Sequence, residues 1–493
     1  MDFKAFKGAW SERPTIHLSV EVPADLLTPA SVFLKLGGDK AKASFLLESV
    51  EAGENVGRYS IIGVDPSETI VLTARECRYT IGRSTQSYAA KELGRLIRSR
   101  LPGTHSVDSD GAFGLTGGWV GYLGYDCVRL FERLPARTSD TTGHPWAMLG
   151  LYKRVVVFDH ARQTARAVAT AGRAIDERSS AKTAYDSAQR GLDDIVRHLL
   201  KSHPMPDLKP LSEKRATSNT TRAAFSDGVR IFKKHIGRGD IFQGVLSQRF
   251  SVPGTIPSFD VYRRLRRSNP SPYMYFLRCG NLAIAGSSPE TLVQKRGTTV
   301  TTRPIAGTRP RGATPSDDAR LERNLLASVK ENAEHVMLVD LGRNDLGRVC
   351  RPGTVATGQL RVIDRYSHVM HLVSTVTGQT RRGVDAFDVL SATFPAGTVT
   401  GAPKIRAMEL IDAVEPDRRG VYAGCVGYID WYDNLDMAIA IRTAVIDKKG
   451  GSVQAGAGIV ADSDPDREYT ETCNKAAAPL LALGGIIEDE REP

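Results

Sequence analysis

Residues 454–475 read QAGAGIVADSDPDREYTETCNK. The polar run at 462–466 combines Asp, Ser and Pro, which are residue types that favour turns. The residues after it predict a helix that begins with Glu468 and Glu471, and side chains three positions apart on a helix share one face. We expect the buried side of this helix to comprise Ala476, Ala477, Leu480 and Leu481.

A second stretch, KENAEHVM at 330–337, repeats this spacing with Glu331 and Glu334. Ser316 and the two aspartates after it predict the start of the helix that carries them. The apolar residues that recur at helical spacing from there are Leu321, Leu325, Val329, Ala333 and Val336. Each glutamate pair alone is typical of a solvated helix face. The alternative is that the four carboxylates meet around Mg²⁺, which accepts a few hard oxygen ligands and completes its shell with water and substrate oxygens. The spacing does not choose between the two.

Composition narrows the class of protein. The chain has 493 residues and a formal charge of +10, which suits two large domains or one composite. Lys and Arg are spread along the chain and are not interleaved with aromatic residues, so we expect a small anionic substrate and no nucleic acid. No apolar run is long enough to cross a bilayer. The N-terminus lacks a secretory h-region, and the six scattered cysteines contain no C-x-x-C pair. These features predict a cytoplasmic protein with free thiols and no membrane association.

The polar, Pro-bearing segment 201–222 follows a helix-like stretch from about Ala181 to Leu200, and it is the best linker candidate. We therefore expect an N-terminal domain over residues 1–215 and a second domain over residues 216–493. The runs TIVLTA (69–74) and YKRVVVFD (152–159) predict strands in the first of these.

Several long stretches resemble the chorismate-utilising enzymes, and most of all the component I (large subunit) family of anthranilate synthase. They are TTRPIAGTRPRG (301–312), AEHVMLVDLGRNDLGRVC (333–350), DRYSHVMHLVS (364–374), AGTVTGAPKIRAMELI (396–411), GVYAGCVGYID (420–430), AIAIRTAVI (438–446) and the stretch at 454–475. LLESVE (46–51) and GGWVGYLGYD (117–126) extend the resemblance to the N-terminal part. The resemblance implies an α+β fold, an α/β sandwich with large antiparallel sheets and flanking helices, in which residues 216–493 bind chorismate.

In activity, the resemblance implies a lyase of the carbon–oxygen, oxo-acid type that converts chorismate and ammonia to anthranilate and pyruvate. This is the first step of tryptophan biosynthesis, and it requires Mg²⁺. Carried onto this chain, Glu334 and Glu471 would be direct Mg²⁺ ligands, while Glu331 and Glu468 would act through waters.

The chemistry also needs a general acid, because hydroxide is a poor leaving group. The resemblance assigns this role to Glu290 in GSSPE (286–290), although the local sequence fits a surface turn equally well. The catalytic positions that it implies are Glu290, His371, Thr398 and Gln243. The substrate contacts that it implies are Ala306, Gly307, Thr308, Tyr422, Arg442, Gly456, Ala457, Gly458 and Lys475.

Two positions separate the related activities. Relatives that make aminodeoxychorismate carry a nucleophilic lysine where this chain has Ala306. Isochorismate and salicylate synthases carry a water-activating lysine where it has Gln243, and an amide is not a general base at neutral pH. Both positions favour ammonia as the nucleophile. They leave open an enzyme that stops at aminodeoxyisochorismate.

No stretch resembles a glutamine amidotransferase domain, so we expect a separate glutaminase subunit. We also expect this chain to form either a homo-oligomer or a heterotetramer with the glutaminase. The resemblance also implies inhibition by tryptophan at a second site. The residues expected there are Leu47, Glu48, Ser49, Asn269, Pro270, Pro272, Tyr273 and Met274. Rival interpretations are a metal-dependent nuclease, which no nucleic-acid-binding motif supports, and an inactive relative that only holds the glutaminase.

Overall fold

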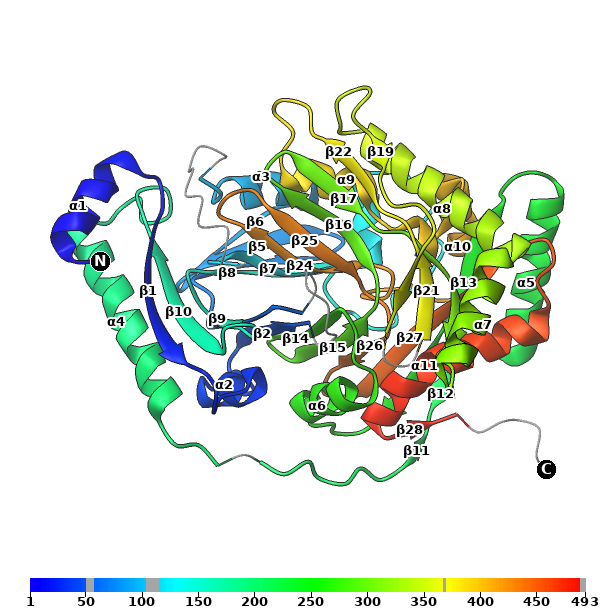
Figure 1. The fold of residues 1–493 in the computed structure, drawn as a ribbon, viewed down its shortest axis with the longest axis horizontal. Coiled ribbons are helices and arrows are strands. Elements are labelled where there is room, and N and C mark those ends of the chain that lie inside the picture. Colours follow the sequence, from blue (N-terminus) through cyan, green and yellow to red (C-terminus); the bar gives the residue numbers. More distant parts are fainter. Residues whose placement is uncertain (50–56, 103–114, 205, 367–368, 488–493) are drawn as a thin grey trace.

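Two large antiparallel sheets dominate the computed structural model, which describes residues 1–49, 57–102, 115–204, 206–366 and 369–487 (Figure 1). In spatial order the first sheet contains β1 (Ile16–Pro23), β10 (Thr164–Ala171), β9 (Arg154–Asp159), β3 (Tyr59–Val64), β2 (Ala43–Glu48), β14 (Tyr273–Cys279), β15 (Leu282–Ser288), β26 (Thr443–Ile446), β27 (Gly450–Ile459), β13 (Gln243–Pro253) and β12 (Thr217–Ser218), with β23 (Gly401–Ala402) also paired to β13.

The second sheet contains β19 (Ala356–Thr357), β22 (Val376–Gln379), β17 (Thr299–Thr302), β16 (Thr291–Arg296), β25 (Leu435–Ile439), β24 (Cys425–Asp430), β7 (Gly118–Leu123), β8 (Ala147–Tyr152), β4 (Glu68–Leu72), β5 (Glu76–Ile81) and β6 (Ser84–Ala89). A small sheet is formed by β18 (Ile305–Pro310), β21 (Val369–Val373) and β20 (Val362–Arg365), and β11 (Lys214–Arg215) pairs in parallel with β28 (Gly485–Ile486).

The two large sheets face each other across a shared apolar layer. Phe45 and Tyr275 of the first sheet and Tyr122 and Tyr428 of the second are buried in this layer. The outer face of the first sheet is covered by α1 (Phe3–Glu12), α2 (Pro29–Lys35), α4 (Ala181–Leu200), α6 (Ser258–Ser268) and α11 (Pro465–Leu483). The outer face of the second is covered by α3 (Leu93–Arg98), α8 (Val329–Gly347) and α9 (Ala386–Thr393). The expected sandwich of antiparallel sheets with flanking helices is confirmed.

Each large sheet takes strands from both parts of the chain. In the first sheet β2 pairs with β14, and in the second β7 pairs with β24. The segment between α4 and β11 is extended and runs along the lower edge of the view in Figure 1. The expected boundary at residues 215 and 216 lies beside this segment, but each sheet is continuous across it. The two parts of the chain therefore share both sheets rather than each holding its own.

The helix expected from Ser316 through Val336 is in fact two helices. α7 (Pro315–Ala327) is capped by Thr314, and α8 begins after Ser328, whose backbone is extended with ψ of 111°. The apolar spacing fails beyond the break, since Val329 is 84% and Val336 is 47% exposed. The single-helix prediction was wrong because the chain turns at Ser328, and α8 buries another face. The buried face of α8 comprises His335, Leu338, Val339 and Leu346.

The helix expected after the turn at 462–466 is present as α11, and Asp464 caps it by accepting a hydrogen bond from the Arg467 amide. Ala476 and Leu480 are buried as expected, but Ala477 and Leu481 are exposed. Neighbouring residues on a helix point about 100° apart, so only one of each neighbouring pair reaches the sheet.

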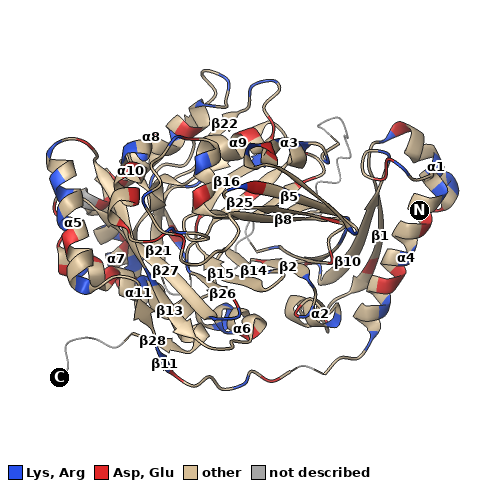
Figure 2. Ribbon diagram, turned by 180° about the vertical axis from the view of Figure 1, so that it is seen from behind, with Lys and Arg blue, Asp and Glu red and all other residues tan. Residues whose placement is uncertain are grey.

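The remaining helices are α5 (Arg222–Gly237) and α10 (Lys404–Val414), which pack on β13 and β27. In the described part of the chain, none of the helices is long and apolar enough to cross a membrane. In the view of Figure 2, basic and acidic residues are interspersed over the helices and loops that the structure describes.

Candidate active site

Glu290 lies in the turn that leads from β15 into β16, and it is only 8% exposed. Its backbone is fixed because the Ile439 amide donates to its carbonyl oxygen and its own amide donates to the Ser288 hydroxyl. Burial raises the pKa of its carboxyl group to about 7, against the opposing effects of the Thr398 hydroxyl and the Lys475 charge. The carboxyl group is therefore partly protonated at neutral pH and can act as an acid. It is not the surface turn residue that the local sequence also allowed.

Thr398, in the short helix η4 (Gly397–Val399), lies next to Glu290, since its hydroxyl acts on the Glu290 carboxyl group. Gln243, at the start of β13, is 4% exposed, and its Nε2 donates to Glu334 at 3.4 Å. The carbonyl oxygen of the Gln243 amide is buried and has no hydrogen-bond partner among the described residues. Buried polar groups normally find partners, so an orphaned oxygen at this place favours a ligand site.

Gly456 and Gly458 lie inside the strand β27 rather than in a turn. A Cβ atom at Gly456 would stand 2.6 Å from the Tyr422 hydroxyl, and one at Gly458 would stand 2.5 Å from Nε2 of Gln243. Only glycine leaves room for those side chains. Ala457 between them is fully buried in the core beneath α5 and α10, so its side chain belongs to that core rather than to the site.

Two cationic side chains meet beside this strand. Nζ of Lys475 donates to the Gly456 carbonyl at 3.0 Å, and Nη1 of Arg442 donates to the Lys475 carbonyl at 2.6 Å. Burial lowers the pKa of Arg442, while the nearby Tyr422 and Glu471 oppose that shift. Arg442 also has a positive φ of 51°, a backbone strain that non-glycine residues carry mostly at functional sites. Two cations at one place suit a substrate with carboxylates.

The strand pair β18 and β21 contributes the remaining expected residues. Ala306 is buried, and a bulge separates it from Thr308 because Gly307 adopts a left-handed φ of 63°. Nδ1 of His371 lies 2.9 Å from the Thr308 hydroxyl and 3.3 Å from the Gly307 carbonyl. A carbonyl only accepts, so Nδ1 carries the hydrogen and Nε2 has the free lone pair. Burial lowers the pKa of His371, with a further contribution from the Arg442 charge, so the ring is neutral at pH 7.

The four glutamates border the same region but do not form a ready-made metal cluster. Glu331 pairs with Arg309 at 3.1 Å and lies against Gly307, while Glu471 pairs with Lys475 at 2.5 Å. Glu468 is 8% exposed. Over the residues that the structure describes, no three His, Cys, Asp or Glu side chains are arranged to hold a metal ion. An ion here would take at most two protein carboxylates and would need water and substrate oxygens, which Mg²⁺ tolerates.

The two segments expected at the second site are neighbouring strands. In the register of β2 and β14, Met274 pairs with Glu48 and Tyr275 pairs with Leu47. Oε1 of Glu48 and the Ser49 hydroxyl are buried and have no partner among the described residues. Residues 50 and 51 of the LLESVE motif, and 367–368 of the DRYSHVMHLVS motif, lie outside the described residues.

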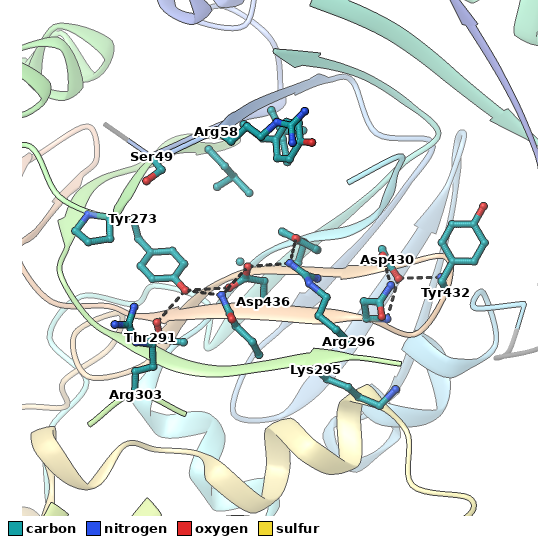
Figure 3. Close-up of a pocket in the computed structure, with 18 of the residues that line it drawn as sticks. Ser49, Arg58, Tyr273, Thr291, Lys295, Arg296, Arg303, Asp430, Tyr432 and Asp436 are labelled. Atoms are coloured by element: carbon teal, nitrogen blue, oxygen red, sulfur yellow. Dashed lines mark hydrogen bonds and ion pairs between the residues drawn. The ribbon is translucent and has the colours of Figure 1, made fainter. Parts of the chain in front are cut away.

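A cavity of about 2560 Å³ opens beside this strand pair. Of the expected residues, those that line it are Leu47, Glu48, Ser49, Pro270, Pro272, Tyr273 and Met274. Glu290 does not line the cavity, although its neighbours Pro289 and Thr291 do. Figure 3 shows Ser49 and Tyr273 on one side, with Thr291 and Asp436 next to the Tyr273 hydroxyl. The cavity and the candidate active site are therefore distinct, but they are adjacent in the chain, since Glu290 stands between two residues that line the cavity.

Ser287 joins the two sites through hydrogen bonds. Asn269, which does not line the cavity, donates its amide to the Ser287 hydroxyl at 2.6 Å. The Ser287 amide in turn donates to the Arg442 carbonyl at 3.1 Å. Sequence reasoning missed this link, since a serine inside a strand carries no signal of a long-range partner.

Comparison with known proteins identifies a family and several relatives. The family profile described as chorismate binding enzyme matches residues 42–481. A protein of Pseudomonas aeruginosa named anthranilate synthase component 1 is 44% identical over 95% of this chain and 95% of its own length. A protein of the same name from Cereibacter sphaeroides is 42% identical over 97% of this chain and 96% of its own length.

Solved structures give the same comparison at the level of the fold. The crystal structure of anthranilate synthase component I from Streptococcus pneumoniae has a TM-score of 0.77 at 35% identity, and covers 93% of this chain and 99% of that chain. The menaquinone-specific isochorismate synthase of Escherichia coli has a TM-score of 0.70 at 20% identity, covering 98% of both chains, which shows a shared fold alone.

Proposed function

This chain belongs to the family of chorismate binding enzymes, and from that premise we propose that it is the chorismate-converting subunit of an anthranilate synthase. In the reaction, chorismate and ammonia give anthranilate, pyruvate and water. The relatives at 42–44% identity over nearly the whole chain support this activity over the others in the family.

The observation that carries the proposal is the buried Glu290 carboxyl group with a pKa of about 7. It lies beside Thr398 and Lys475, in reach of two cationic groups that suit a dicarboxylate substrate. An acid of this strength is what the departure of a ring hydroxyl requires, because its pKa matches the working pH.

In the first step ammonia forms a bond to C2 of the ring, the two ring double bonds shift to C1=C6 and C4=C5, and the C4–O bond breaks. Glu290 gives its proton to the C4 hydroxyl, which departs as water. The new ammonium group then loses a proton, and the uptake of a proton by the Glu290 carboxylate returns the site to its starting charge. Arg442 and Lys475 hold the substrate carboxylates during this step. Unprotonated ammonia attacks without the help of a general base, so an amide side chain such as that of Gln243 is sufficient at the position beside it.

For the metal we propose Glu334 and Glu471 as direct ligands, with Glu331 and Glu468 acting through waters. The carboxylate oxygens of this set fit a hard divalent ion that also takes substrate oxygens. When bound, Mg²⁺ would supply positive charge that attracts the ring carboxylate and withdraws electron density from the ring.

In the second step His371 is suited to accept the C2 proton at Nε2, since its Nδ1 faces the Gly307 carbonyl. The electrons of the C2–H bond complete the aromatic ring, and the ether bond at C3 breaks. Enolpyruvate leaves and takes up a proton to become pyruvate. Thr398, close to Glu290, is the other residue that we place in this step.

Ala306 and Gln243 support ammonia as the nucleophile, because neither side chain can attack the ring or activate water. An enzyme that releases the aminated intermediate is the second candidate. The neutral His371, which is poised to take a proton, favours the complete reaction.

A partner and an inhibitor complete the proposal. We propose that a separate glutaminase subunit supplies ammonia, since ammonium predominates over ammonia at neutral pH. We also propose that tryptophan binds in the cavity beside the β2–β14 strand pair. There the unpaired Glu48 oxygen and Ser49 hydroxyl would receive its amino group, and Pro272, Tyr273 and Met274 would contact the indole.

The test is to incubate the purified chain with chorismate and ammonium, with and without Mg²⁺, and to identify the product by fluorescence and mass. We expect anthranilate only when Mg²⁺ is present. Isochorismate, salicylate or an accumulating aminated ring would overturn the proposal. Glutamine in place of ammonium should give no product unless a glutaminase subunit is added.

A further inference from the structure

A buried ion pair lies directly behind the candidate active site. Arg419 is 4% and Glu415 is 5% exposed, and the two residues follow the end of α10. Nε of Arg419 donates to Oε2 of Glu415 at 2.9 Å, and Nη2 donates to Oε1 at 2.6 Å. The Ser247 amide and hydroxyl also donate to Oε1 of Glu415. Neither residue belongs to the expected substrate contacts.

The remaining donors of the Arg419 guanidinium reach two backbone carbonyls. Nη1 donates to the carbonyl of Val399 at 2.7 Å, and Nη2 donates to the carbonyl of Val245 at 2.8 Å. Val399 is the residue after Thr398 in η4. Val245 lies two residues after Gln243 in β13, and it pairs with Gly458 of β27. One side chain therefore ties together the segments that carry Thr398, Gln243 and Gly458.

The same guanidinium lies over two aromatic rings. Its central carbon is 5.5 Å from the ring centroid of Tyr422 and 4.9 Å from that of Tyr125. Such a contact is attractive because the ring face is electronegative. The hydroxyl of Tyr422 points at the small residue Gly456, so Arg419 also fixes the ring that closes this side of the site.

A lysine could not make this set of contacts. The guanidinium presents five N–H groups in a rigid plane, and four interactions in different directions use that plane here. A lysine ammonium offers a point charge on a flexible chain, so it can keep the Glu415 pair but cannot hold Val399 and Val245 at once.

We propose that Arg419, held by Glu415, is a positioning residue that sets the places of Thr398 and Tyr422 for the second step of the reaction. This inference rests on the proposed function, in which Thr398 takes part in the elimination. Arg419 acts through these residues and does not contact the substrate.

The test compares Arg419→Lys with wild type in the presence of chorismate, ammonium and Mg²⁺. We expect kcat for anthranilate to fall about 10²-fold, since small displacements of reacting groups have effects of that size. The KM for chorismate should change by less than about threefold, because Arg442 and Lys475 are untouched. A displaced Thr398 slows the second step more than the first, so the aminated ring that keeps its enolpyruvyl group should accumulate.

The matched control is Arg129→Lys. Arg129 is also a largely buried arginine, and it pairs with Asp412 of α10 at 2.7 Å. Its other hydrogen bonds go to Asp126, Leu134 and Pro135, none of which is a site residue. A purely structural loss lowers both steps equally, so this variant should leave the product ratio unchanged. Glu415→Gln keeps one of the two oxygens that accept from Arg419 and loses the other. It is the alternative variant if Arg419→Lys does not fold, and it should shift the ratio in the same direction.

If wild type formed no anthranilate, the proposed function and this inference would both fail. If wild type formed anthranilate while Arg419→Lys and Glu415→Gln kept the product ratio of the Arg129→Lys control, only the positioning role would be overturned.

Discussion

At the scale of single residues, the raised pKa of Glu290 suits its proposed role as an acid, but it lowers the stability of the folded chain at neutral pH. Its pKa is about 7 in the folded chain and about 4.5 in an unfolded chain. The folded state therefore binds the proton more tightly, and folding loses free energy as the pH rises from about 4.5 through 7. Over the interval from pH 5 to pH 8 this loss is about 2.5 kcal/mol.

Glu290→Gln should remove that loss and the activity together. We expect kcat to fall by about 10²- to 10⁴-fold, because the amide cannot donate the proton. We also expect the free energy of unfolding of the variant, relative to wild type, to rise by about 2 to 3 kcal/mol between pH 5 and pH 8. Denaturant titrations at both pH values measure this. A difference between the two proteins that does not change with pH would contradict the buried, titrating carboxyl group. For wild type, kcat/KM should decline above a pH of about 7.

The proposed metal ligands give a second prediction at this scale. Glu334→Ala and Glu471→Ala should each lower kcat/KM by at least about 10²-fold at fixed Mg²⁺, since each removes half of the direct protein ligands. Raising the Mg²⁺ concentration should restore part of the rate. Glu409→Ala is the control, because Glu409 pairs with Arg406 on the exposed side of α10. Wild-type rates in both ligand variants would refute the assignment.

At the scale of secondary-structure elements, β14 and β15 connect the cavity with the candidate active site. Asn269 holds the Ser287 side chain, and the Ser287 backbone holds Arg442. A ligand that shifts the start of β14 would therefore act on Arg442, a proposed substrate-binding residue, through one hydroxyl group. By linkage, such a ligand and chorismate weaken each other's binding by the same factor.

Ser287→Ala should cut this connection while leaving both sites in place. We expect tryptophan to bind with an affinity close to that of wild type, but the factor by which it weakens chorismate binding should fall toward one. Tryptophan titrations at several chorismate concentrations measure that factor.

Two further variants serve as comparisons for Ser287→Ala. Ser49→Phe should instead lose tryptophan binding itself and spare catalysis. Ser44→Ala is the control for removing a buried hydroxyl from the same sheet, since Ser44 bonds to the Gly38 carbonyl away from both sites. If tryptophan weakened chorismate binding in Ser287→Ala by the same factor as in wild type, the connection between the two sites would not run through the Ser287 hydroxyl.

The elements also show how far the sequence alone could go. Local signals placed the α4 helix and the turn before α11 correctly, because propensity and caps act over a few residues. They failed at Ser328, because Val329 continues the apolar spacing of the preceding helix although its side chain is exposed. The roles of Glu290 and Gln243, and a shared site for residues 47–49 and 272–274, were suggested by family resemblance alone. Arg419 was overlooked, although the charges of Glu415 and Arg419 are four residues apart, because a pair at that spacing usually lies on a surface.

At the scale of the whole molecule, the two parts of the chain share both sheets. The joining segment, residues 206–212, is largely exposed and contains neither helix nor strand. The structure therefore depends on the paired strands rather than on this covalent connection.

Cleavage at a protease site inserted within residues 206–210 should leave the two pieces associated and active. They should elute together on gel filtration, because β2–β14 and β7–β24 keep their pairing. Expressed alone, each piece exposes a long strand edge and the apolar layer between the sheets, so we expect aggregation. Two separately folded and soluble pieces would contradict this, and uncut protein carrying the inserted site is the control.

The residues proposed for chemistry all come from positions 243–475, whereas the cavity takes Leu47, Glu48 and Ser49 from the other side of the β2–β14 pair. The proposed tryptophan site therefore depends on residues from both sides of the β2–β14 pair, whereas none of the residues proposed for chemistry lies in β2. Local damage to β2 should accordingly weaken inhibition by tryptophan before it lowers the rate of anthranilate formation. Partly damaged copies of such an enzyme would overproduce tryptophan in a cell before they ceased to make it.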